Sequence, residues 1–337
     1  MSFFNNCSTI IRRSNKDMFF IRLEDGITFD YFNCENELVS SQKIFPKTNI
    51  DFTNFYISLD KDDNIYGIYN DESLFIIEIP KDSTKVSSKE ILSYDNKKFD
   101  ISFPYIKCLD DSTHILYYVY DTNYSNACAL FHHYKQRDCW IENKIDFIDN
   151  ILLDDFSVIS NQNSLVVFYF KLVDYHEELF FSQFNSSNLT WSKPIQITNS
   201  GNNKVYLSIL KDSMNFYHIS FCEKIDSGYV VRYINGYLNE GSFDIETSNS
   251  LTKPSTCMYP SLLKKGSIIY VMWVDFGRLN TSVSYDLGKT WSNKKTDEFS
   301  VEDDFVRARF ISNYKDDLPY NASCIFTTSS AVEILGF

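Results

Sequence analysis

Strand-like alternation of apolar and polar residues, broken by short polar turns, runs along this 337-residue chain. Clear examples span residues 103–121, 156–172, 205–221 and 259–275, and each reads as two apolar strands around a turn of Asp, Asn, Ser or Gly. No stretch shows convincingly the 3.6-residue apolar period of an amphipathic helix. The pattern therefore predicts an all-β protein.

The hairpins recur at a nearly fixed interval. When the strands are aligned, one apolar position returns every 48 to 54 residues, at Leu38, Val86, Trp140, Trp191, Phe243 and Trp291. This spacing matches the ~40–50 residues of a four-stranded propeller blade. We therefore expect residues 1–337 to form a single β-propeller domain, in which each sheet packs its face on the next.

The end of the chain decides the expected number of blades. Three further candidate strands lie near 304–312, 320–327 and 330–336, and the first residues, "MSFFNN", precede the first hairpin. If the last blade takes its outer strand from the N-terminus, the ring closes with few exposed edges. This interpretation predicts seven blades, with six as the alternative.

The composition narrows the classes of binding partner that we expect for this protein. A formal charge of −13 and a pI near 4.9 oppose binding to nucleic acid or to an anionic membrane, because phosphates attract clustered Lys and Arg. The eight cysteines are dispersed without C-x-x-C spacing, which predicts reduced thiols. The sequence shows no secretory leader and no apolar span, so we expect a soluble cytoplasmic protein without a cofactor.

The octapeptide "SYDLGKTW" carries a recognisable turn pattern. In it, Ser284 and Thr290 supply hydroxyl groups, Asp286 supplies a carboxylate acceptor for backbone N–H groups, Gly288 allows a positive φ, and Trp291 fills the gap under the hairpin. The octapeptide is similar to the Asp-box, S-x-D-x-G-x-T-W, and with it the chain resembles the sialidase-like β-propellers, also called BNR-repeat proteins.

This resemblance implies a structural role for the octapeptide, since in the family the Asp-box joins the third and fourth strands of a blade, away from the catalytic centre. Worn copies occupy 133–140, 184–191 and 236–243, where the repeated aromatics are Trp140, Trp191 and Phe243. Surface contact with a ligand or partner is the alternative role.

The resemblance also sets an expectation about catalysis. Sialidases of this fold hold the substrate carboxylate with three arginines, the first of which lies in an early F/Y-R-I-P sequence. This chain has no such sequence, so we predict no catalytic residues. Four arginines on candidate innermost strands, Arg12, Arg13, Arg307 and Arg309, form instead a candidate channel site for an anion or glycan. The alternative is that they pair with acids such as Asp303 and Asp304.

Other candidate chemistry is weaker. His132 and His133 point to opposite faces of a strand, so a shared metal ion is not expected. "YHEEL" at 175–179 lacks the second His of a zinc motif and is interpreted as a solvated loop. Adjacent carboxylates at 62–63, 110–111, 154–155 and 316–317 are interpreted as turn residues. Aromatics in expected loops after second strands, which could stack on sugars, are Tyr120, Tyr124, Tyr175 and Phe276.

Taken together, the sequence predicts a non-catalytic propeller that acts as a binding or interaction scaffold for a carbohydrate or a protein partner. A divergent, sialidase-like glycoside hydrolase that uses channel arginines and a carboxylate is the alternative. A purely structural assembly component is the third reading.

Overall fold

The structure is a computed structural model, and it describes residues 7–109, 112–124, 126–137, 139–161, 164–239, 241–328 and 334–336. Almost all regular structure in these residues is β-strand, with one short helix, α1 (Phe299–Glu302). The expectation of an all-β protein is confirmed. The chain divides into two compact units, Met1–Asp149 with Arg307–Leu318 (unit 1) and Asn150–Val306 with Pro319–Phe337 (unit 2).

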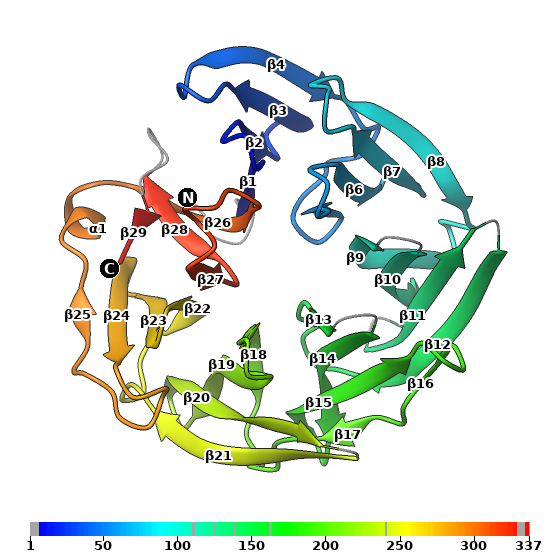
Figure 1. Ribbon diagram of the computed structural model, residues 1–337. Coiled ribbons are helices and arrows are strands. Elements are labelled where there is room, and N and C mark those ends of the chain that lie inside the picture. The colour runs from blue at the N-terminus through cyan, green and yellow to red at the C-terminus, as the bar shows by residue number, and fades with distance from the viewer. Residues whose placement is uncertain are drawn as a thin grey trace. The chain divides into compact units, whose positions relative to one another are not determined.

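Unit 1 contains three sheets, and each has a set of four consecutive antiparallel strands (Figure 1). The first sheet comprises β1 (Cys7–Arg12), β2 (Met18–Arg22), β3 (Ile27–Phe32) and β4 (Leu38–Ile44). The second comprises β5 (Phe55–Leu59), β6 (Ile65–Asn70), β7 (Ser73–Ile79) and β8 (Ser87–Ser93). The third comprises β9 (Phe99–Leu109), β10 (Ser112–Asp121), β11 (Ala127–Gln136) and β12 (Cys139–Asp149).

Unit 2 repeats this plan. Its first sheet holds β13 (Ser157–Asn161), β14 (Ser164–Val173) and β15 (His176–Asn185), with a fourth strand broken into β16 (Thr190–Trp191) and β17 (Ile195–Gln196). The next holds β18 (Lys204–Lys211), β19 (Phe216–Ile225), β20 (Gly228–Asn239) and β21 (Ser242–Ser250). The last holds β22 (Met258–Lys265), β23 (Ile268–Asp275), β24 (Arg278–Ser284) and β25 (Lys295–Thr296).

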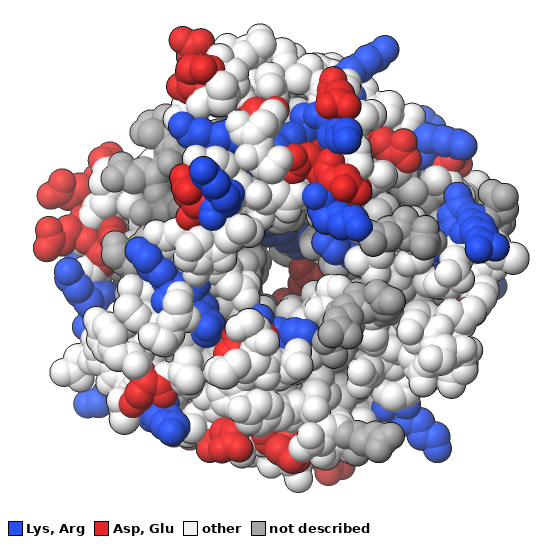
Figure 2. Space-filling model, viewed as in Figure 1, with Lys and Arg blue, Asp and Glu red and all other residues white. Residues whose placement is uncertain are grey.

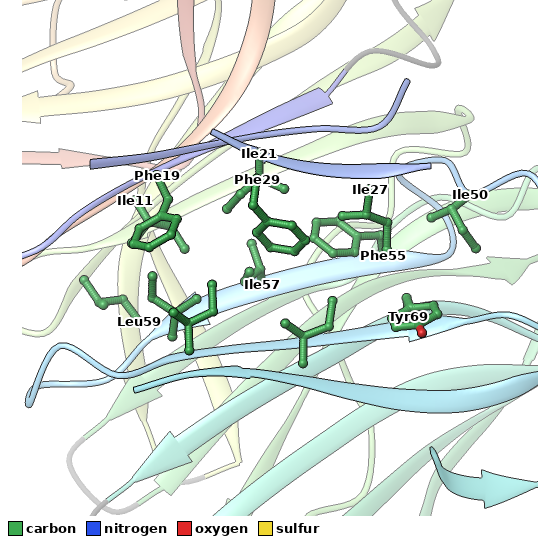
Figure 3. Packing of buried hydrophobic residues seen from close by; sticks show 13 residues of the cluster. Ile11, Phe19, Ile21, Ile27, Phe29, Ile50, Phe55, Ile57, Leu59 and Tyr69 are labelled. Carbon is green, nitrogen blue, oxygen red and sulfur yellow. The ribbon is translucent and has the colours of Figure 1, made fainter. Parts of the chain in front are cut away.

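Neighbouring sheets pack face to face through bulky apolar side chains. In unit 1, Phe19 and Phe29 of the first sheet meet Phe55 and Ile57 of the second in one buried cluster, and Figure 3 shows these side chains pointing toward one another. Alternate residues of a strand point to opposite faces, so each sheet can bury both faces against its neighbours. This packing explains why the strands inside each sheet carry apolar side chains on both faces.

Unit 2 is held together in the same way. Phe168 and Phe181 of its first sheet pack with Tyr217 and Phe221 of the second. Another cluster joins Tyr233 of the second sheet with buried residues of the third, among them Trp273. Each fully buried side chain of this size contributes roughly 1.5–3 kcal/mol of hydrophobic stabilisation.

The prediction of seven blades is wrong, because the strands of the described residues form six sheets, each built around one run of consecutive antiparallel strands. The late strands expected to build a seventh blade are too short, or pair elsewhere. β26 (Phe305–Ser312) runs parallel to β1, with Cys7 opposite Arg307 and Arg12 opposite Ser312. β27 (Tyr320–Ala322) pairs with β22, and β28 (Ile325–Thr328) pairs with β29 (Ile334–Leu335).

The expected closure by the N-terminus is also corrected in part. Residues 1–6 lie outside the described residues, but β1 is the first strand of its own sheet and not the outer strand of another. The added strand comes from the C-terminal part of the chain, since β26 extends the sheet beyond β1. Whether the chain is one domain, as expected, stays a prediction.

Candidate functional site

The four predicted arginines do not converge on one point. Arg12 lies at the end of β1, and its Nη1 forms an ion pair with Asp317 at 3.2 Å. In the β1–β26 register Arg12 is opposite Ser312, whereas Arg307 and Arg309 lie opposite residues near the start of β1. Arg12 and Arg309 therefore lie several residues apart along the paired strands, each of which rises about 3.3 Å per residue.

Arg13 is a buried structural cation. Its side chain is 2% exposed and donates hydrogen bonds to main-chain carbonyl oxygens of the second sheet's turns. The acceptors are Asp63 at 3.0 Å, Ser83 at 3.1 Å and Pro80 at 2.8 Å, and the carboxylate of Asp17 lies 3.7 Å away. Because its guanidinium is buried among these groups, Arg13 ties two sheets together and does not face a ligand.

Arg309 lies in a different environment, against two tyrosines. Its guanidinium carbon is 4.7 Å from the centre of the Tyr56 ring on β5, and its Nη1 donates to the Phe55 carbonyl oxygen at 3.4 Å. The Tyr56 ring centre is in turn 4.6 Å from that of Tyr105 on β9, at an interplanar angle of 43°. Arg309 and Tyr56 are partly exposed, whereas Tyr105 is buried.

A second cation adjoins these tyrosines along β9. Lys107 lies two residues after Tyr105, on the same face of the strand, and its Nζ donates to the Leu59 carbonyl oxygen at 3.3 Å. Burial lowers the pKa of Lys107, while burial raises that of Tyr105 well above its usual value. We call Tyr56, Tyr105, Lys107 and Arg309 the unit 1 cluster.

The unit 1 cluster combines flat rings with positive charge. A guanidinium stacked on an aromatic ring keeps its N–H donors at its edge, where they match a carboxylate or sulfate in a bidentate pair. Arg307 lies two residues before Arg309, so both side chains leave β26 on the same side. This set of groups suits an anionic ligand with a flat apolar face.

Acids close to the unit 1 cluster are occupied by the chain itself. Asp60 accepts hydrogen bonds from the Asp62 and Asn64 amides within its own turn. The Asp63 carboxylate accepts hydrogen bonds from Ser14 and Asn313. Burial raises the pKa of Asp63, but these hydrogen bonds lower it more, so the pKa lies below its usual value. These carboxylates act as turn and strand anchors, as the sequence predicted for 62–63.

The octapeptide forms a tightly hydrogen-bonded turn after β24. The Asp286 carboxylate accepts bonds from the Thr290 amide at 2.8 Å and the Thr290 hydroxyl at 2.6 Å, and Gly288 N donates to Ser284 Oγ at 2.8 Å. These bonds, first of all those from Thr290, lower the pKa of Asp286 to about 2. Trp291 Nε1 donates to the Gly288 carbonyl oxygen at 3.1 Å.

Gly288 has a φ of +88°, and a Cβ at this position would collide with the Tyr233 ring and hydroxyl. The turn lies between the third and fourth strands of its sheet, where the Asp-box pattern places it. Membership of the family stays a prediction.

The other repeated aromatics differ in burial. Trp191 packs at 5.4 Å on Phe184, and Phe243 packs against the buried cluster that contains Tyr217. Trp140, in unit 1, is 46% exposed. In every sheet the repeated position falls at or just before the fourth strand, and this agreement accounts for the six-fold period of the sequence.

The structure corrects one interpretation directly. Residues 176–179 of "YHEEL" are the start of β15 and not a solvated loop, and Glu177 and Glu178 are 3% and 1% exposed. Glu178 pairs with the buried Lys204 at 2.7 Å, and Lys204 also approaches Glu223 at 3.7 Å. No sequence pattern signals these pairs, because charged residues at strand starts usually face solvent.

The remaining candidates are placed as follows. His132 is stacked on His114, whereas His133 bonds to the Tyr117 hydroxyl, so the two histidines have different partners. Tyr120 lies within β10 rather than in a loop, and its hydroxyl donates to Asp100 at 2.5 Å.

The aromatics at 124, 175 and 276 lie at turns between second and third strands and are 73%, 85% and 75% exposed. The acids at 110–111 lie outside the described residues.

In the described part of the chain, no group of three or more His, Cys, Asp or Glu residues is arranged to hold a metal ion. No helix there has the length and apolar character needed to cross a membrane. In Figure 2, acidic and basic side chains are interspersed over the face in view, so a ligand on this face meets local groups rather than one broad field.

Comparison with solved structures identifies the fold. The α-L-arabinofuranosidase of Fusarium graminearum, of glycoside hydrolase family GH93, is similar with a TM-score of 0.53 and 10% identity over 85% of this chain and 96% of that chain. In complex with an iminosugar inhibitor, the α-L-arabinofuranosidase Arb93A from this organism matches over 98% and 99%, with a TM-score of 0.52.

The polysaccharide lyase Uly1 has a TM-score of 0.52 and 9% identity, over 88% and 82% of the two chains. No family model and no curated protein matches this chain. At these identities the likeness shows the fold, a β-propeller, and the six sheets are its blades.

Proposed function

We propose that this protein is a non-catalytic propeller that binds an acidic carbohydrate, one that carries carboxylate or sulfate groups. The observation that supports it most is the unit 1 cluster, in which Arg309 stacks on Tyr56 and Tyr56 packs on Tyr105. A sugar ring can stack on a tyrosine face while its acid group pairs with a guanidinium. Relatedness to the sialidase-like propellers is part of this proposal.

The positions of the charged groups favour binding over hydrolysis. Glycoside hydrolysis uses two carboxylates about 5–10 Å apart across the scissile bond. In the turn after Leu59, which accepts the Lys107 hydrogen bond, Asp60 holds its own turn and the Asp63 carboxylate is bonded to Ser14. The similar solved structures include a glycoside hydrolase and a polysaccharide lyase, which supports a carbohydrate ligand for a propeller of this kind.

The direct test is binding of a carboxylated oligosaccharide, oligogalacturonate, measured by titration calorimetry. We expect saturable binding that weakens as salt rises, because the guanidinium–carboxylate pair is partly exposed. Arg309→Gln is expected to weaken it about tenfold or more, since a hydrogen bond to a charged group contributes about 1.5–3 kcal/mol. The matched control is Arg278→Gln, which removes an exposed arginine of unit 2.

Two outcomes contradict the proposal. If oligogalacturonate and a sulfated oligosaccharide both fail to bind the wild type, the cluster is not an anion site. If a panel of chromogenic glycosides, including a sialoside, is turned over and Arg307→Ala abolishes the turnover, the protein is the divergent glycoside hydrolase instead.

A further inference from the structure

A second set of tyrosines lies on first strands of unit 2, with acids where unit 1 has cations. Tyr206 on β18 and Tyr259 on β22 have ring centres 4.4 Å apart, at an interplanar angle of 44°. Tyr259 is buried and fixes the position of Tyr206, which is partly exposed. Tyr229, at the start of β20, is partly exposed and packs against the same buried cluster of unit 2 as Tyr206.

The backbone holds these rings in an unusual conformation. Tyr206 and Tyr259 have φ values of 63° and 51°, in the left-handed region that non-glycine residues rarely occupy. Each lies in a β-bulge, since the pairing register shifts between Val205 and Ser208 and again between Met258 and Ser261. A bulge turns a side chain away from its normal face, and bulges are frequent next to binding sites.

A carboxylate is positioned at the first of these bulges. Asp154, which precedes β13, accepts a hydrogen bond from the Tyr206 amide and another from the Asp155 amide at 2.9 Å. Burial, and after it the Asp154 charge, raise the pKa of Tyr206 to about 12. The Asp154 carboxylate is held beside the main chain of Tyr206 by the hydrogen bond from the Tyr206 amide.

The wider surroundings are also acidic. Glu177 accepts the amides of Ile151 and Leu152, which lie just before Asp154 in the chain. Besides burial, Glu177 and Cys222 contribute to the raised pKa of Tyr229. Two further carboxylates of unit 2, Glu178 and Glu223, are paired with the cations Lys204 and Arg232.

We propose that Tyr206, Tyr229 and Asp154 form a second binding site, for a ring-shaped ligand that carries a protonated amine, namely an amino sugar. Aromatic faces attract cations and pack on sugar rings, and a carboxylate beside them adds an ion pair. An anionic sugar is repelled here, so the site differs in ligand class from the unit 1 cluster. The proposal does not depend on whether the unit 1 cluster binds acidic carbohydrate.

The test compares two probes of the same length, a glucosamine oligomer and its N-acetylated counterpart, by titration calorimetry on the full chain. The two present the same ring faces, but only the first carries ammonium groups. We expect the glucosamine oligomer to bind at least about tenfold more tightly, because only it can pair with Asp154. Equal affinity for the two probes, or no binding of either, overturns the proposal.

Variants locate the site. Asp154→Asn is expected to weaken glucosamine binding about tenfold while its amide oxygen still accepts the Tyr206 N–H. Glu246→Gln, which removes an exposed acid of β21, is the control and is expected to change nothing. Should Asp154→Asn fail to fold, Tyr229→Leu removes the aromatic face instead. Unchanged binding in the folded variant contradicts the site, whatever happens to oligogalacturonate binding.

Discussion

The two units build nearly the same aromatic contact and surround it with opposite charges. The tyrosine pair at 56 and 105 in unit 1 has ring centres 4.6 Å apart at 43°, and the pair at 206 and 259 in unit 2 has 4.4 Å and 44°. In both, first strands of neighbouring sheets supply the rings. Arg309 and Lys107 accompany the first pair, whereas Asp154 accompanies the second. Packing explains the rings, so the charges must distinguish the two proposed ligands.

The buried cations of the two units differ in a parallel way. Arg13 in unit 1 is held mainly by main-chain carbonyl oxygens, while Lys204 in unit 2 is held by the carboxylates of Glu178 and Glu223 and by the Ser200 hydroxyl at 2.8 Å. Removal of Arg13 and removal of Lys204 therefore leave different groups without their cation. A buried anion without its partner is more costly than a carbonyl without one.

The largest expected effect follows from this difference. Lys204→Met leaves Glu178 and Glu223 buried with less compensation, and we expect the free energy of unfolding to fall by about 3–5 kcal/mol. Arg13→Met is expected to cost less, about 1–3 kcal/mol, because it leaves mainly carbonyl acceptors, and the Asp17 carboxylate 3.7 Å away keeps its hydrogen bonds from Asn15 and Tyr31. Urea unfolding followed by fluorescence measures both, with the exposed Lys224→Met as control. Equal losses of unfolding free energy in the two variants would remove the proposed distinction between the two buried cations.

Acid should destabilise unit 1 more than unit 2. His114 and His132 are buried together, 3.0 Å apart between Nδ1 and Nε2, and burial lowers their pKa values to about 4 and about 2. His218 in unit 2 has a pKa of about 4, again through burial, but the Asp212 carboxylate 3.7 Å away opposes the shift.

The sign of this effect follows from the direction of the shifts. An unfolded histidine titrates near pH 6.5, so the unfolded chain takes up protons first, and stability present above pH 6.5 is lost as pH falls toward 4. At pH 4.5 the loss is about 2–3 kcal/mol per histidine. Because unit 1 has two such histidines, we expect the double variant His114→Gln/His132→Gln to flatten the pH dependence of the unfolding midpoint between pH 7 and 4.5 more than His218→Gln does. Equal flattening in the two variants contradicts this account.

A smaller effect is expected at the octapeptide turn after β24. This turn, in unit 2, is the most complete copy of the repeated pattern. Gly288→Ala must place a methyl group against the Tyr233 ring, and Gly266→Ala meets nothing within 4 Å, although both glycines have a positive φ. Gly266→Ala is the control, because it introduces only the backbone strain of an alanine at a positive φ. We expect Gly288→Ala to cost about 1–3 kcal/mol more than Gly266→Ala in thermal unfolding. Equal costs would show that the turn tolerates a methyl group.

The sequence predicted the fold more fully than the sites. Alternation and the recurrence of Trp140, Trp191 and Trp291 gave the all-β class, and the six recurrences matched six sheets. The seventh blade was added from the chain end, where apolar segments predict strands but not their partners. Parallel pairing of β26 with β1 joins residues about 300 positions apart, and no local pattern reports such a contact.

The sequence predicted less about the surroundings of the candidate site residues, for a related reason. Alternation placed Arg307 and Arg309 on one strand but could not show that Tyr56 and Tyr105 come from other sheets to meet Arg309. Arg13 carried the same pattern and proved to be a buried clamp. Residue type and spacing identify which side chains share a face, whereas burial and the identity of a partner depend on tertiary packing.

The smallest expected effect separates the repeated aromatics of the two units. Trp140 in unit 1 is 46% exposed and has Lys135 over its ring at 5.6 Å, an exposed cation–π contact that contributes about 0.5–1 kcal/mol. Trp291 in unit 2 is partly buried, packs edge-on against Tyr233 at 4.7 Å and donates to the Gly288 carbonyl oxygen.

Trp140→Ala should therefore lower the free energy of unfolding by less than about 1 kcal/mol, and Trp291→Ala by about 2 kcal/mol, roughly half the value for a fully buried tryptophan. Lys135→Ala is the matched control, because it removes the cation over Trp140 and leaves the indole in place. If Trp140→Ala is as damaging as Trp291→Ala, the repeated position stabilises both units equally. The worn copies of the turn would then be equivalent to the complete one, and the difference between the two units would be confined to the charges beside their tyrosine pairs.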